Sequence, residues 1–351
     1  MNFNPRLGAF LLLLAASALQ LPGQTTDAER KQFESVKASA DKGDAEAQLN
    51  VAGFYSNGTG VSKDPAKAAK YIRKAAEQGV ARAQCLLGLL FSNGDGVKVD
   101  KVEAARWLHR AAEQGLAEAQ YDLGMCYETG DGVAKNPVEA VEWFRKAAAQ
   151  GLPDAEGEIG NCYLEGTGVP TDIPEGLKWT RRAADRGFAP SQNTLGLCYS
   201  KGRGVTKDYV EAYKWFNLAA SKGGDIADDA RINLAAAERF LKPEQISEAQ
   251  RLAREFKVRK GPAAKEPEPA ASGSNASAKV LKTGVVNVKA EDDSYEIFVD
   301  GAFVGNTPAN VKLVEGSHVV EVKKAGFKDY RKQIKITEGS ELTLRAVLEK
   351  P

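Results

Sequence analysis

Hydrophobic and polar positions along the chain follow two different periods. Between residues 45 and 223, apolar side chains recur every three or four positions, as in Val51, Ala52 and Tyr55, which is typical of helices with one buried face. From about residue 283, short segments such as YEIFVDG and ANVKLVEG alternate with a period of two, which is typical of strands. The change of period predicts a helical region followed by a separate β region.

The helical region consists of five copies of one 36-residue pattern, which span residues 45–223. Each copy carries three glycines at fixed positions, which are Gly58, Gly60 and Gly79 in the first copy. A fourth position holds Ala52 in the first copy and glycine in the other four, so that a neighbouring helix can approach closely there. Repetition at this period predicts an all-α solenoid of helix-turn-helix units.

Each copy contains two predicted helices. The first begins at Ala45 and ends at Gly58, which can adopt the left-handed backbone that stops a helix. The second starts after Asp64, a residue type that caps helix N-termini, and ends at Gly79. We expect the solenoid to occupy residues 26–257, with a capping helix at 26–42 and two further helices at 226–257, because terminal repeats are atypical.

The segments AEAQLNVAGFYSNGTGV, AQYDLGMCYETGDGV and WFRKAAAQG resemble the Sel-one-like repeat (SLR) family, a subclass of the tetratricopeptide-like helical repeats. The closing segment KPEQISEAQRLAREF is similar to the usual tail of that family. The resemblance implies an α-solenoid that serves as a protein-interaction scaffold. Some members of the family have been assigned enzymatic activity.

The β region, residues 283–349, contains six or more short strands and predicts a small antiparallel β-sandwich. Asp300-Gly301 between two strand-like runs predicts a hairpin. The string VDGAFVGNTPANVKLVEGSHVVEVKKAGF resembles the PEGA domain family, which occurs mostly on exported or surface-associated bacterial proteins. Residues 258–282, rich in Pro, Ala, Ser and Gly, are predicted to form a flexible linker.

Residues 1–18 have the pattern of a secretory signal peptide. Arg6 precedes the apolar run LGAFLLLLAA, and Ala16 and Ala18 are small residues of the kind that a signal peptidase requires. The apolar run of roughly 13 residues is shorter than the ~18–20 residues of a membrane-spanning helix. We therefore expect an exported protein, periplasmic or at the cell surface, with no transmembrane segment after signal removal; an uncleaved anchor or a buried helix is the alternative.

Three of the four cysteines, Cys126, Cys162 and Cys198, are 36 residues apart and so occupy one position of the repeat. Equivalent positions on stacked helices lie about 10 Å apart, whereas a disulfide needs Cα atoms within ~7 Å. We expect small buried thiols rather than a disulfide framework, which remains the alternative in an exported chain.

The composition argues against most catalytic and nucleic-acid-binding schemes. Lys and Arg number 48 and Asp and Glu 47, which leaves a net charge of +1 and no broad basic surface. The chain has two histidines, His109, expected on a solvated helix face, and His318, expected in a structural hydrogen bond. The glycine loops lack the Gly-Lys-Ser/Thr of a phosphate loop. We therefore expect no catalytic site, no metal site and no cofactor.

The first helices of the repeats offer a surface for a protein or peptide partner, because first helices usually line the concave side of stacked helix pairs. The predicted contact residues mix apolar, aromatic and polar side chains: Leu89, Tyr121, Asp122, Met125, Glu158, Asn161, Asn193 and Leu197. The alternative is that the leucines and the methionine pack inside the solenoid.

The sequence as a whole predicts an exported, non-enzymatic scaffold that binds proteins or peptides, with the β region docking or tethering at the cell envelope. Two alternatives remain. One is a cell-envelope hydrolase acting on peptidoglycan or on a β-lactam, which rests only on the family resemblance. The other is a protein that binds a glycan or a cell-surface polymer through the β region, where Tyr295, Phe298, Phe303, Phe327 and Tyr330 are the aromatic residues.

Overall fold

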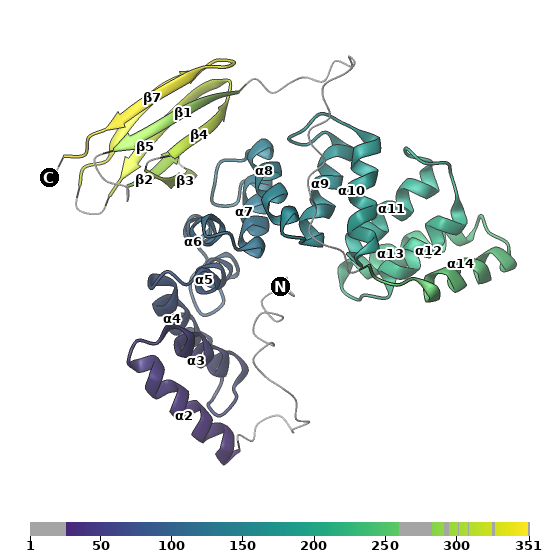
Figure 1. The fold of residues 1–351 in the computed structure, drawn as a ribbon, viewed down its shortest axis with the longest axis horizontal. Coiled ribbons are helices and arrows are strands. Elements are labelled where there is room, and N and C mark those ends of the chain that lie inside the picture. Colours follow the sequence, from purple (N-terminus) through teal and green to yellow (C-terminus); the bar gives the residue numbers. More distant parts are fainter. Residues whose placement is uncertain are drawn as a thin grey trace. The chain divides into compact units, whose positions relative to one another are not determined.

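The computed structural model describes residues 26–259, 283–290, 295–300, 302–307, 309–324 and 327–349, in which thirteen helices precede seven strands (Figure 1). The predicted signal peptide and the predicted linker from residue 260 onward lie outside the described residues. The chain divides into two compact units, which we describe separately. The first comprises the described residues of 1–135 and 282–351, and the second those of 136–281.

Six helices of the first unit belong to the solenoid, and each ends where its sequence predicts. They are α2 (Asp27–Asp41), α3 (Ala45–Asn57), α4 (Pro65–Glu77), α5 (Ala81–Asn93), α6 (Lys101–Glu113) and α7 (Ala117–Thr129). The first helix of each repeat stops at a left-handed glycine, such as Gly58 with a φ of 76°. The second helix begins at a side-chain cap, since Oδ1 of Asp64 accepts a hydrogen bond of 2.9 Å from the backbone N–H of Lys67.

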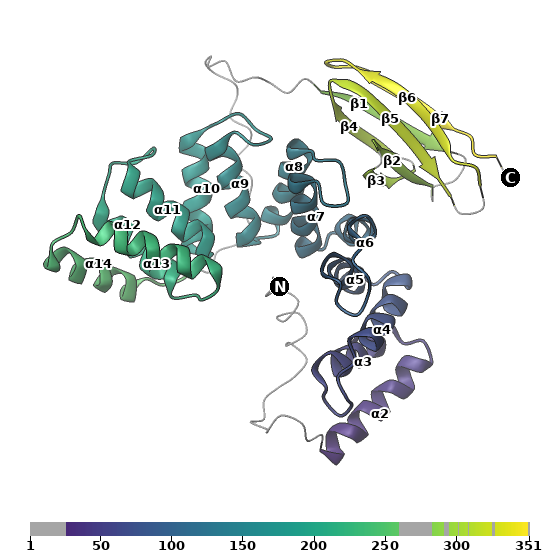
Figure 2. The same cartoon turned by 180° about the vertical axis from the view of Figure 1, so that it is seen from behind.

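Seven helices form the second unit (Figure 2). They are α8 (Pro137–Ala149), α9 (Pro153–Glu165), α10 (Ile173–Asp185), α11 (Ala189–Lys201), α12 (Tyr209–Ala220), α13 (Asp225–Glu238) and α14 (Pro243–Glu255). The pairs α9/α10 and α11/α12 are helix-turn-helix repeats, while α13 and α14 both pack on α12. Among all the described residues, no helix is both long and apolar enough to cross a bilayer.

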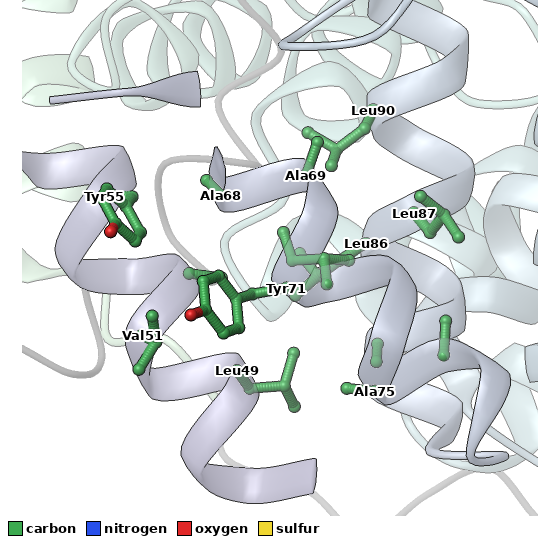
Figure 3. Close-up of a cluster of buried hydrophobic side chains, with 14 of the residues drawn as sticks. Leu49, Val51, Tyr55, Ala68, Ala69, Tyr71, Ala75, Leu86, Leu87 and Leu90 are labelled. Carbon is green, nitrogen blue, oxygen red and sulfur yellow. The ribbon is translucent and has the colours of Figure 1, made fainter. Parts of the chain in front are cut away.

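The core of the first unit forms where three successive helices meet (Figure 3). Val51 on α3 and Leu87 on α5 are fully buried, and Ala75 on α4 lies with them in the same cluster. The rings of Tyr55 and Tyr71 stack with their centroids 6.0 Å apart. Small residues on α4, such as Ala75, lie beside larger residues on α3 and α5, such as Val51 and Leu87. This combination allows the three helices to pack at the density of a protein interior.

The second loop glycine of each repeat explains how neighbouring repeats fit together. A Cβ added to Gly96 would overlap the backbone of α4, 2.5 Å from the carbonyl carbon of Pro65 and 2.9 Å from the amide nitrogen of Ala66. Gly60 meets α2 in the same way, and Gly168 meets the first turn of α8. These glycines therefore allow the loop of one repeat to rest on the second helix of the preceding repeat.

The C-terminal domain has two sheets. Its strands are β1 (Thr283–Ala290), β2 (Glu296–Val299), β3 (Ala302–Asn306), β4 (Ala309–Val314), β5 (Gly316–Lys323), β6 (Tyr330–Ile336) and β7 (Glu341–Ala346). The strand orders are β4-β1-β7 and β3-β2-β5-β6. Alternate residues such as Val286, Ile297 and Val320 are fully buried and form one core.

The prediction of a small β-sandwich is confirmed, with one correction. The sheets are not wholly antiparallel, because β1 pairs with β7 in parallel, Val286 lying opposite Leu342. The reason is topological: β7 returns beside β1 after the chain has completed the second sheet. The predicted turn at Asp300 is present, and Asp300 has a positive φ of 52°.

Candidate interaction surface

The predicted contact residues of the first unit differ in exposure. Leu89 on α5 is 6% exposed and Tyr121 on α7 is 8% exposed, so both are buried. Asp122 and Met125, also on α7, are partly exposed. Leu89 and Met125 occupy the same position of the repeat, and yet only Met125 keeps part of its side chain in contact with solvent.

The predicted residues of the second unit show the same division. Glu158 and Asn161 on α9 are partly exposed, and Nδ2 of Asn161 donates a hydrogen bond of 3.1 Å to Oε2 of Glu158. This bond fixes the two side chains against each other on one face of α9.

The last two predicted residues, Asn193 and Leu197 on α11, are covered by α13. Nδ2 of Asn233 donates a hydrogen bond of 3.0 Å to Oδ1 of Asn193, which is 8% exposed. Leu197 is partly exposed and packs against the cluster that contains Phe216 of α12 and Ala237 of α13. The sequence prediction missed Asn233, although the 36-residue spacing between the starts of α11 and α13 places it on the next first helix.

Buried glutamines join each first helix to the preceding repeat. Nε2 of Gln48 donates to the carbonyl oxygen of Ala40 at 3.2 Å, and Oε1 of Gln48 accepts from Nε2 of Gln78 at 2.8 Å. Gln84 repeats both bonds, with Ala76 and with Gln114. Because a buried polar group without a partner costs about 1–3 kcal/mol, these pairs hold the helices in one register.

The fourth repeat replaces this glutamine with Glu156, which is fully buried. Its Oε1 accepts from Nη1 of Arg186 and lies 2.9 Å from Nε of Arg182, while Oε2 is buried without a hydrogen-bond partner. Burial raises the pKa of Glu156, and the two guanidinium groups oppose that effect. Arg186 stands where the first three repeats have glutamine, so both members of the pair change together.

Basic side chains on the second helices rest on aromatic rings. Nζ of Lys146 lies 3.5 Å from the ring centre of Trp143, and Nη2 of Arg145 donates to the hydroxyl of Tyr163 at 2.8 Å. Such contacts contribute about 0.5–2 kcal/mol each. The Arg145–Tyr163 bond joins α8 to α9, whereas the Lys146–Trp143 contact lies within α8.

Each of the two histidines of the sequence lies beside a carboxylate. Nδ1 of His318 lies 2.7 Å from Oδ2 of Asp300, which is the expected structural hydrogen bond. His109 lies 3.5 Å from Glu113, and only 12% of its side chain is exposed, so the expectation of a solvated residue was wrong. The carboxylate of Glu113 lies beside the ring because the two residues are one helical turn apart on α6.

None of the four cysteines, all of which lie in the described residues, forms a disulfide, and Cys85, Cys162 and Cys198 are buried. Burial raises the pKa of Cys126 to about 12, so this thiol stays protonated at neutral pH. Within the described part of the chain, no three His, Cys, Asp or Glu side chains are grouped so that they could hold a metal ion.

The geometry above is that of a known repeat family. The Sel1 repeat model matches residues 45–80, 81–116, 117–152, 153–188 and 189–224, which is half of the chain. This chain is a Sel1 repeat protein. The PEGA domain model matches residues 283–351, so this Sel1 repeat protein also carries a C-terminal PEGA domain. Both resemblances seen in the sequence are therefore confirmed.

One solved structure supports the assignment, and a second is reported beside it. A Sel1 repeat protein from Oxalobacter formigenes is 29% identical, with a TM-score of 0.58 over 66% of this chain and 93% of that one. A protective antigen present in uropathogenic Escherichia coli strains, which displays an SLR fold, is 31% identical, with a TM-score of 0.46 over 65% of this chain and 56% of that one. No curated protein matches the sequence. Sel1 repeat proteins generally mediate protein–protein interactions.

Proposed function

We propose that this Sel1 repeat protein is an exported, non-enzymatic scaffold that binds a protein or peptide along the first helices of its repeats. The observation that carries the proposal is that first helices in both units carry mixed, partly exposed side chains, which are Asp122 and Met125 on α7 in the first unit and Glu158 and Asn161 on α9 in the second. These four contact residues offer apolar area for affinity and polar groups for orientation, which are the two requirements of a peptide-binding surface.

The other members of the predicted set have a different role in this proposal. Leu89, Tyr121 and Asn193 are buried and support the helices, and Leu197, although partly exposed, packs against the cluster that contains Ala237 of α13. Replacement of these four residues therefore changes stability before it changes binding. Partner contact is assigned to Asp122, Met125, Glu158 and Asn161.

Site-specific photocrosslinking tests the contact residues of each unit in the full-length chain. A photoreactive phenylalanine analogue replaces Met125 in one variant and Asn161 in another, and the matched control carries it at Val99, a loop residue that is 50% exposed. We expect a partner to be crosslinked from positions 125 and 161 and not from position 99. Crosslinks of equal yield from all three positions, or from none, would refute the assignment of the contact residues.

Export and envelope tethering form the second part of the proposal. The PEGA domain supports it, because PEGA domains occur in periplasmic or extracellular proteins. Deletion of residues 2–18 is expected to keep the protein in the cytoplasm, whereas deletion of the PEGA domain should release an exported solenoid from the envelope fraction. Fractionation of bacteria that express each form tests both statements. If the intact chain and the variant that lacks residues 2–18 are distributed equally between the cytoplasmic and exported fractions, export is refuted.

A further inference from the structure

The chain turns back along the helices of the second unit after its last helix. α14 ends at Glu255, and the next four residues, 256–259, form a segment that we call the clasp. The ring of Phe256 meets the ring of Trp215 on α12 edge to face, with 5.5 Å between centroids. The backbone N–H of Arg259 donates a hydrogen bond of 2.9 Å to the carbonyl oxygen of Asp185, the last residue of α10. The clasp therefore reaches from the second helix of the fifth repeat to that of the fourth.

The fifth repeat differs from the others where it receives Phe256. In each of the first four repeats, a basic side chain three positions after the aromatic residue of the second helix rests on its ring: Lys74 on Tyr71, Arg110 on Trp107, Lys146 on Trp143 and Arg182 on Trp179. The fifth repeat has Leu218 at that position, although Lys214 lies 4.6 Å from the ring centre of Trp215. Leu218 and Phe256 both pack against the cluster that contains Trp215, so Phe256 has an apolar neighbour where the other repeats have a charge.

The end of α10 receives Val258 and Arg259. A Cβ added to Gly187 would lie 3.2 Å from Cγ2 of Val258, so the absence of a side chain at this position allows Val258 to approach. At the equivalent glycines of the first, second and fifth repeats, an added Cβ meets no described atom within 4 Å; they are Gly79, Gly115 and Gly223. The carbonyl groups of the last helical turn have no partner inside the helix. The amide of Arg259 supplies such a partner to the carbonyl group of Asp185.

Charge contributes little to the clasp. Nη1 of Arg259 lies 3.4 Å from Oδ2 of Asp185, but 78% of the Arg259 side chain is exposed, and exposed ion pairs stabilise proteins little. Lys257, which is exposed on the clasp, and Lys222, whose Nζ lies near Gly187, add further positive charge to this region. The clasp is therefore held by one backbone hydrogen bond and by the contacts of Phe256 and Val258.

We propose that the clasp closes the C-terminal end of the solenoid. α14 packs on α12, and the clasp gives it a second attachment, at the end of α10. Release of the clasp from α10 therefore loosens α14 as well. The clasp also fixes the start of the predicted linker at the end of α10.

The place where the linker starts matters for the envelope tethering proposed above. A pull on the PEGA domain reaches the solenoid at the end of α10, and the clasp bears it first. This consequence rests on the proposed tethering. Closure by the clasp does not rest on it, and closure can be measured in the purified protein.

Hydrogen exchange of the full-length protein, read by mass spectrometry, tests the closure. Arg259→Pro removes the amide donor, and Arg259→Ala is the matched control, because it keeps the donor and removes the exposed side chain. We expect Arg259→Pro to accelerate exchange of the α14 amides about two- to tenfold, which is the effect of one hydrogen bond. Arg259→Ala should exchange as wild type does. Unchanged exchange of α14 in Arg259→Pro, or equal acceleration by both variants, would overturn the proposal.

Limited proteolysis with trypsin tests the contact of Phe256 separately. Lys257 lies between the two attachments of the clasp, and cleavage after it requires the clasp to open. Phe256→Ala removes the ring, so cleavage after Lys257 should be at least about fivefold faster than in wild type. Phe240→Ala, at a phenylalanine outside the clasp that is 63% exposed, is the matched control and should be cut as wild type is. Cleavage of Phe256→Ala at the rate of wild type would show that the ring does not hold the clasp, and the proposal would be wrong.

Discussion

The loop glycines make a quantitative test of how the repeats fit together. Gly96 and Gly79 both have positive φ values, of 71° and 89°. They differ in their surroundings, because an added Cβ at Gly79 meets no atom within 4 Å, whereas at Gly96 it overlaps the first turn of α4 around Pro65. Replacement of each by alanine therefore separates backbone strain from contact between repeats.

Backbone strain is common to the two variants. An alanine in the left-handed region costs about 1–2 kcal/mol, and Gly79→Ala should lose that amount. In Gly96→Ala the new methyl group also meets backbone atoms, which cannot rotate away as a side chain can. Overpacking of this kind costs typically about 1–3 kcal/mol, so the total loss should be about 2–5 kcal/mol.

Denaturation with urea, followed by circular dichroism, measures both losses against wild type. In a domain of this size, each kcal/mol corresponds to about 2–4 °C in Tm, so thermal melts give an independent check. Equal destabilisation by Gly96→Ala and Gly79→Ala would refute the reasoning, because it would mean that the loop does not bear on α4.

Three further predictions follow from single side chains. Burial raises the pKa of Glu156 above its ordinary value of 4.5. The free energy of unfolding of wild type should therefore decrease relative to that of Glu156→Gln as the pH rises through the raised pKa, with no such decrease at pH values under 4.5. Urea denaturation across this pH range checks the sign of the change. Asp100→Ala removes the 3.0 Å cap bond to the Glu103 amide and should cost about 1 kcal/mol in the same assay, and no change would contradict the cap. Cys126, whose pKa is raised to about 12, should react slowly with a thiol reagent at pH 8 in the native protein and faster after denaturant is added, and fast labelling of the native protein would contradict the raised pKa.

The repeats could be predicted from the sequence because their signals are local. Asp64 caps α4 through an amide three residues away, and Gly58 ends α3 through its own φ angle. Neither signal depends on the rest of the chain. The same signals recur five times at intervals of 36 residues, so the sequence alone predicts the solenoid.

The candidate contact surface could be predicted only in part. Leu89 and Met125 share one repeat position, yet Leu89 is buried and Met125 partly exposed. Asn193 is polar, and it is nevertheless buried because Asn233 of α13 bonds to it. The exposure of a residue depends on the side chains that pack against it. Those side chains come from other repeats, so the sequence pattern of a single repeat does not predict exposure.

By itself, the sequence determined the two domains, the helix pairs, the caps and the family, all of which depend on residues a few positions apart. Tertiary structure decided the rest. It showed that Gly96 is required by the backbone of the preceding repeat as well as by its own φ angle. It also showed that Ile232, an ordinary apolar residue in the sequence, is 68% exposed on α13. The physical reason is that periodicity specifies which side of a helix is apolar, whereas only packing specifies whether another helix covers it.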